Sequence, residues 1–198
     1  MALSNTKICN MALSRLKSKR INDYGDSSES TPQAIYCRLH YETTRDALIE
    51  SYTWRFASGR KTLSVSTVTP DFEWDYQFIL PNDYLAMRSI YEGRFSDENL
   101  ESYALEGDRL LTNESDMEIR YIKKVTDPTK FDPLFVKLFV VLLANELIGP
   151  LAGGNKVIQE KLDRDKADLL YSVRAMSGQQ TNTVGQYDLE TWNDARYT

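Results

Sequence analysis

The stretch from Thr31 to Lys61 constrains the fold most, because a strongly marked helix there runs directly into large aromatic side chains. Ser30 and Thr31 can both cap a helix, and Pro32 suits the first helical position, where its missing N–H would have no helical partner anyway. Apolar residues then recur at an approximate helical period. The pattern predicts a helix from Pro32 to about Tyr52.

Two large rings and an arginine follow this helix, at Trp54, Phe56 and Arg60. At a helix exit, such side chains would pin the next segment against the base of the helix. We therefore interpret them, together with Trp74 in the following segment, as a structural hinge. The alternative is an interface hot spot, because large aromatics and arginine are favoured there.

Three further helices are predicted from apolar periodicity, over 5–17, 134–148 and 156–176. The second of these is apolar nearly all round, so we expect it in the centre of a helical bundle. Gly149 and Pro150 are expected to break or bend it.

The region between the helices reads as short strands separated by turn residues. The predicted strands cover 61–68, 73–80, 84–91, 103–105, 109–112 and 117–125. A single sheet of about five antiparallel strands is the simplest interpretation. The expected fold class is therefore α+β: a four-helix bundle (1–60 and 127–176) with an inserted small antiparallel β domain (61–126) and an extended C-terminal tail (177–198).

The composition is that of an ordinary globular chain, with 41% hydrophobic and 27% charged residues in 198. Its net charge of −5 argues against a dedicated duplex-binding protein. No secretory signal pattern is found, and the window 134–151 contains charged residues and a proline, so no membrane span is expected. We expect the chain to be made in a cytoplasm.

No residue pattern predicts catalysis, a cofactor or a metal. His40 is the single histidine, and no carboxylate lies within helical reach of it. Phosphate-loop, zinc-pair and calcium-loop patterns are missing from the sequence. Cys9 and Cys37 are expected to be buried thiols. The alternatives are a disulfide between two helices and, as the weakest of the three interpretations, a metal site. We expect no enzyme, although an unrecognised site stays an alternative.

A compact basic group lies near the end of the first predicted helix, at Arg15, Lys17, Lys19 and Arg20. Positive charge at a helix C-terminus interacts favourably with the helix dipole. The alternative role is contact with an acidic partner surface or with passing phosphates.

The last residues, from Ser177 on, are rich in Gln, Asn, Thr and Gly and show no period. Such a segment does not bury enough surface to fold alone. It nevertheless carries large side chains at Tyr187, Leu189, Trp192 and Tyr197. They favour a docking arm that orders on a partner, the alternative being a disordered terminus with incidental aromatics.

Motif residues spread along most of the chain carry a family resemblance. They are Asn10-Met11-Ala12-Leu13, then Ala34, Cys37, Tyr41, Arg45-Asp46, Leu48, Trp54, Phe56, Ala57, Arg60 and Leu63, and then Trp74, Tyr76, Phe78, Leu80-Pro81 and Asp83-Tyr84. In this order the pattern resembles the head-to-tail adaptors of short-tailed bacteriophages, the tail tubular protein A type, over about residues 4 to 175. Lys17 departs from it where a glycine often ends the first helix, and Thr53 where a proline often precedes the tryptophan.

The resemblance implies a structural virion protein at the head–tail junction. Its copies would form a ring, usually dodecameric, between the portal protein and the tail nozzle (tail tubular protein B), with a tail fibre or spike as a further candidate partner. Viral DNA would pass through the ring without sequence-specific binding, and the C-terminal tail would dock on the portal. An acidic lumen would repel phosphate and let DNA slide, the alternative being that the acidity serves solubility. The alternative function is a connector or head-completion protein of another type of tailed phage.

Overall fold

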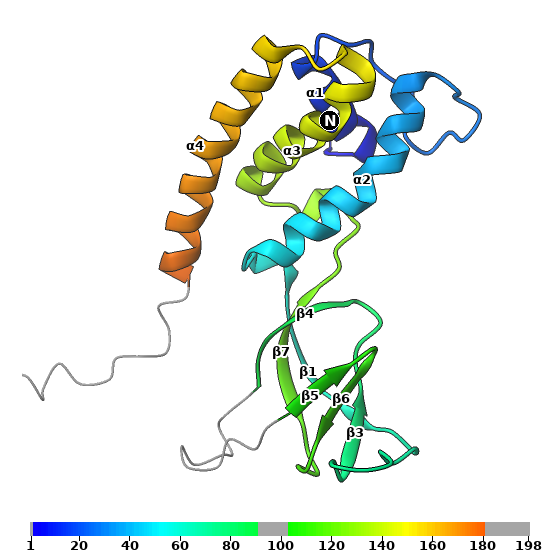
Figure 1. The fold of residues 1–198 in the computed structure, drawn as a ribbon, viewed down its shortest axis with the longest axis vertical. Coiled ribbons are helices and arrows are strands. Elements are labelled where there is room, and N and C mark those ends of the chain that lie inside the picture. Colours follow the sequence, from blue (N-terminus) through cyan, green and yellow to red (C-terminus); the bar gives the residue numbers. More distant parts are fainter. Residues whose placement is uncertain (1, 91–102, 181–198) are drawn as a thin grey trace, which may run out of the picture.

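The computed structural model describes residues 2–90 and 103–180, where it shows an α+β fold of four helices and two small antiparallel sheets (Figure 1). The helices are α1 (Asn5–Arg15), α2 (Pro32–Ser51), α3 (Pro133–Ala152) and α4 (Lys156–Gln180). The strands are β1 (Ser58–Thr62), β2 (Ser64–Val65), β3 (Tyr76–Ile79), β4 (Tyr84–Ile90), β5 (Tyr103–Glu106), β6 (Arg109–Thr112) and β7 (Glu118–Lys123). Helices gather at one end of the molecule and strands at the other.

The starts of α1 and α2 follow from local side-chain chemistry. The Ser4 side chain accepts a hydrogen bond from the N–H of Lys7, and Thr31 accepts one from Ala34, so each residue caps its helix. Pro32 occupies the first position of α2, as predicted. The predicted end of α2 is one residue from the observed one.

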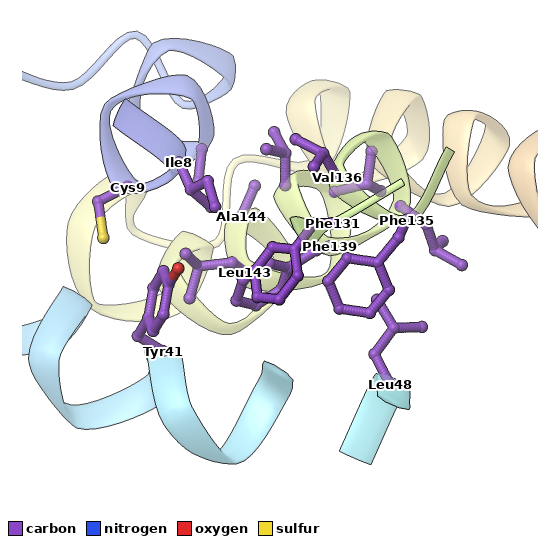
Figure 2. Packing of buried hydrophobic residues seen from close by; sticks show 14 of the residues in the cluster. Ile8, Cys9, Tyr41, Leu48, Phe131, Phe135, Val136, Phe139, Leu143 and Ala144 are labelled. Carbon is purple, nitrogen blue, oxygen red and sulfur yellow. The ribbon is translucent and has the colours of Figure 1, made fainter. Parts of the chain in front are cut away.

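α3 lies in the middle of the helical part and contacts α1, α2 and α4. Figure 2 shows Ile8 of α1 and Tyr41 of α2 packed toward Phe139 and Leu143 of α3. Most of α3 is buried, as its nearly all-round apolar surface predicts. Its central position is therefore confirmed.

Of the two predicted effects of Gly149 and Pro150, a break or a bend, the break is wrong, because α3 continues to Ala152. A proline in the last turn removes a single helical hydrogen bond and leaves the rest of the helix intact. The helix ends instead at Gly153, whose φ of 58° is the left-handed conformation that terminates helices.

α3 is the one helix in the described residues that is long and apolar enough to cross a membrane, with a mean hydropathy of 1.9. This is weak evidence for a membrane span, because a buried core helix has the same length and composition, and 56% of the window is buried inside the protein.

The prediction of one five-stranded sheet is also wrong, because the seven strands within 2–90 and 103–180 form two sheets. One sheet has the order β1-β7-β4 and the other the order β2-β3-β6-β5. The expected strand 61–68 is divided between them at Leu63, which is buried and whose N–H donates to the carbonyl of Met117. Phe78 and Leu110 of one sheet and Ile119 and Tyr121 of the other share one apolar core.

Gly59 of β1 lies directly opposite Tyr121 of β7, and this pair shows why the position needs glycine. A Cβ atom at Gly59 would lie 2.7 Å from Cε1 of Tyr121. We expect Gly59→Ala to lower the free energy of unfolding by about 1–3 kcal/mol, because the aromatic ring must shift. Urea unfolding followed by circular dichroism measures this loss.

The control for this prediction is a second substitution that removes the ring. In a Tyr121→Leu background, Gly59→Ala should cost clearly less, with a coupling energy of about 0.5–3 kcal/mol. Equal costs in both backgrounds would mean that the ring is not what excludes a side chain at this position.

Candidate functional site

Trp54 lies at the joint between the helices and the strands, with 1% of its surface exposed. Its indole N–H donates to the carbonyl of Leu48 near the end of α2, at 2.9 Å. Its ring meets Phe135 of α3 edge-on, with ring centres 5.0 Å apart. Trp54 therefore fixes the end of α2 against the central helix.

Phe56 and Phe131 complete this aromatic joint, which we define as Trp54, Phe56, Phe131 and Phe135. The ring of Phe56 lies 5.0 Å from that of Phe135 and 5.5 Å from that of Phe131. Trp54 and Phe56 belong to the chain that leaves the helices, and Phe131 and Phe135 to the chain that returns to them. Figure 1 shows the two crossings between the helices and the strands. The ring contacts pack both of them into one cluster.

Arg60 and Trp74 lie away from the aromatic joint, although the sequence interpretation grouped them with it. Arg60 is exposed on β1. Trp74 is half-buried between β2 and β3. The physical reason is that β1 carries Arg60 away from the helices, whereas Trp74 precedes a strand of the other sheet.

A second contact across the joint is ionic and was missed by the sequence analysis. One carboxylate oxygen of Asp46 accepts from Nε of Arg45 at 2.8 Å, and the other from Nζ of Lys124, just after β7, also at 2.8 Å. Arg45 is 2% exposed, and its Nη2 has no hydrogen-bond partner among the residues described. Burial raises the pKa of Asp46, whereas the hydrogen bonds from Arg45 and Lys124 lower it, and the lowering prevails.

The structure brings Glu146 of α3 near His40, with Nδ1 and Oε2 3.9 Å apart. The pair lies in a groove of about 440 Å³ that α2, α3 and α4 enclose. A general base and its orienting group lie within about 2.6–3.2 Å of each other. The observed separation of Nδ1 and Oε2 is longer than this range, so the two side chains are neighbours without a hydrogen bond between them.

The thiols of Cys9 and Cys37 are free and buried, as expected. A hydrogen bond to Cys37, together with burial, raises the pKa of the Cys9 thiol. Both residues belong to the helical core, in agreement with a packing role. Within 2–90 and 103–180, no group of three or more His, Cys, Asp or Glu residues is placed to hold a metal ion.

The basic group at the end of α1 has a partly structural role. Arg15 forms an ion pair with Asp165 of α4. Lys17 adopts a φ of 55°, and the N–H of Ser18 donates to the carbonyl of Leu13, so Lys17 ends the helix as glycine usually does. The departure at Lys17 therefore still gives the left-handed helix termination that glycine provides, and α1 ends at Arg15, shortly before the predicted end at residue 17.

The proposed docking residues Tyr187, Leu189, Trp192 and Tyr197 lie outside the described residues. No family model matches the chain, and no curated protein matches it.

Proposed function

We propose that this chain is a structural virion protein, a head-to-tail adaptor whose copies form a ring between the portal protein and the tail nozzle. The observation that carries the proposal is the division of the chain into a helical core and a separate β core, joined at one aromatic joint. An adaptor must offer different surfaces to the structure above it and the structure below it. Two ends of different architecture, held by a packed joint, suit that task.

The family resemblance in the sequence supplies the rest of the proposal. It implies a dodecameric ring with the portal and the nozzle as its partners. It also implies a channel through which viral DNA passes without sequence-specific binding. The net charge of −5 per copy supports such a channel, because repeated acidic subunits around a lumen would repel phosphate. A ring whose lumen is neutral or basic would contradict this part of the proposal.

Mass measurement tests the function directly. The purified chain is examined alone and after mixing with portal rings of the same virus, by native mass spectrometry and light scattering. We expect a stable complex in which many copies are bound to each portal ring. If the chain binds neither portal rings nor the nozzle nor capsids, the proposed adaptor function is contradicted.

Removal of 181–198 should weaken attachment to the portal while leaving the fold intact, because the sequence places four large docking side chains there. We expect at least a tenfold loss of binding to portal-bearing capsids and an unchanged thermal midpoint. Co-sedimentation with capsids measures the binding.

The matched control for this truncation keeps the full length and replaces Leu189 and Trp192 by alanine. This variant should lose most of the binding that the truncation loses. If both variants attach to capsids as well as the wild type does, the docking arm is refuted. The ring itself is tested separately, by the mass measurement.

A further inference from the structure

We propose that an acidic loop of one copy docks in a basic groove of the next copy, and that this contact joins neighbours in the ring. The acidic loop is residues 70–75, between β2 and β3. The basic groove lies along β1 and β7 and is lined by Arg60, Lys61, Thr62, Glu118, Ile119 and Arg120. The inference rests on the proposed function and names the surfaces that would build the ring.

The acidic loop presents an apolar side chain among carboxylates. Phe72 is 80% exposed, more than any other large hydrophobic side chain in the described parts of the chain. It lies between Asp71 and Glu73, and Asp75 adds a third exposed negative charge. Aromatic side chains are enriched at protein-interaction sites, where a polar rim surrounds them.

The backbone holds this loop in one strained shape. Glu73 has a φ of 71°, a left-handed conformation that a residue with a side chain seldom adopts. The N–H of Trp74 donates to the carbonyl of Phe72 at 2.9 Å, and the N–H of Asp75 to Oδ1 of Asn113 at 3.0 Å. Strain that the surroundings maintain is commonly found at functional loops.

The basic groove has more basic than acidic residues in its lining, although the chain as a whole is acidic. It has a volume of about 420 Å³, and the residues that line it include Arg60, Lys61 and Arg120 and one acidic residue, Glu118. Arg60 is exposed and lies directly opposite Arg120 in the register of β1 and β7, so both guanidinium groups share one face of the sheet. A third arginine, Arg88 of β4, donates to Ser58 at the start of β1, at 3.3 Å.

The two surfaces are complementary in charge and in chemistry. The loop offers three carboxylates to a groove with a net positive charge, and arginine also stacks on aromatic rings such as that of Phe72. Within one copy, Phe72 stays exposed, so the loop does not fill the groove of its own chain. A second copy is therefore the occupant that we infer.

The use of two different patches has a consequence for symmetry. A patch that binds itself gives a closed dimer, whereas a loop that binds a different surface on the next copy gives a head-to-tail series. Such a series closes into a ring when the rotation between neighbours allows it. The loop and the groove are thus the kind of pair that a ring requires.

Charge reversal tests the contact. One variant carries Asp71→Lys and Glu73→Lys, and the other carries Arg60→Glu and Lys61→Glu; all four positions are exposed, so the fold should persist. We expect each variant alone to lose at least tenfold in ring formation on portal rings. An equimolar mixture should recover it, because each loop then meets a groove of opposite charge in an alternating ring.

The control carries Glu160→Lys and Asp168→Lys on α4, which changes the net charge as the loop variant does. It should assemble like the wild type. If the wild type assembles and both reversal variants assemble equally well, the loop–groove contact is wrong and the adaptor function stands. If the wild type itself does not assemble on portal rings, the adaptor function fails.

A cross-linking measurement decides the contact without a portal. Carbodiimide joins the Nζ of Lys61 to a carboxylate of Asp71 or Glu73 as an amide, with loss of water. In a concentrated mixture of ¹⁴N- and ¹⁵N-labelled protein, we expect this peptide to link one label to the other. If no cross-link between differently labelled chains is found at these residues, the proposed contact is overturned.

Discussion

Trp54→Ala should lower the free energy of unfolding by about 3–5 kcal/mol, the loss expected when a buried tryptophan is truncated. The indole is 1% exposed and contacts Phe135 of the central helix. Its removal leaves a cavity at the joint and deprives the carbonyl of Leu48 of its indole hydrogen bond. Urea unfolding of the isolated chain, followed by circular dichroism, measures the change.

Two variants separate the causes of this loss. Trp54→Phe keeps a ring but removes the hydrogen bond to Leu48, so it should cost about 1–3 kcal/mol. Trp74→Ala, at a half-buried position outside the joint, should cost less than Trp54→Ala. A Trp54→Ala chain that is as stable as the wild type but no longer assembles would make Trp54 an interface residue and contradict the core assignment.

The helices could be predicted because their signals are local. The signal for the start of α2 is only two residues long: Thr31 caps the helix with its side chain, and Pro32 is the first helical residue, both as expected. The central position of α3 follows from its uniform apolar surface. The end of α3 was mispredicted, because the effect of Pro150 depends on how close it lies to the helix end.

The sheets could be predicted only in part, since strand pairing joins residues far apart in the sequence. The alternation of Tyr76 and Phe78 correctly places a strand, β3. It does not reveal that β3 pairs with β2 and β6, or that Leu63 marks the passage from one sheet to the other. These features depend on the shared core, which no local pattern describes.

The same limit applies to the candidate site. Trp54 and Phe56 were recognisable as large rings at a helix exit, whereas their partner Phe135 arrives from a helix about eighty residues later. The ionic contact of Asp46 with Lys124 likewise joins a helix to a distant strand end. The one local indication of this contact was the neighbouring residue Arg45, a charged residue on the buried face of α2.

Asp46→Asn should lower the free energy of unfolding by about 3 kcal/mol, at the low end of the range for breaking a buried ion pair. The low end applies because the side chain of Asp46 is 22% exposed. The loss arises because Arg45, 2% exposed, keeps its charge and loses the carboxylate that compensates it. Urea unfolding at neutral pH measures the effect.

The neighbouring substitutions should cost less, for the same physical reason. Arg45→Met removes the buried charge itself, and the carboxylate that it leaves behind is partly exposed and keeps Lys124 as its partner, so the loss should be smaller than for Asp46→Asn. Lys124→Met removes a cation that is 40% exposed, and exposed ion pairs contribute about 0–1 kcal/mol. A larger loss from Lys124→Met than from Asp46→Asn would contradict the assignment of Arg45 as the charge that matters.

The pH dependence gives an independent check on Asp46. Its pKa in the folded chain is lowered, so its carboxylate stabilises the fold above the ordinary aspartate pKa of about 3.9, and this contribution is lost as the pH falls through the folded value. The stability difference between wild type and Asp46→Asn should therefore be constant near neutral pH and shrink below about pH 4. The difference isolates Asp46 because other acidic groups, such as Asp127, titrate in both chains. A difference that persists unchanged to low pH would show that the charge on Asp46 does not hold the joint.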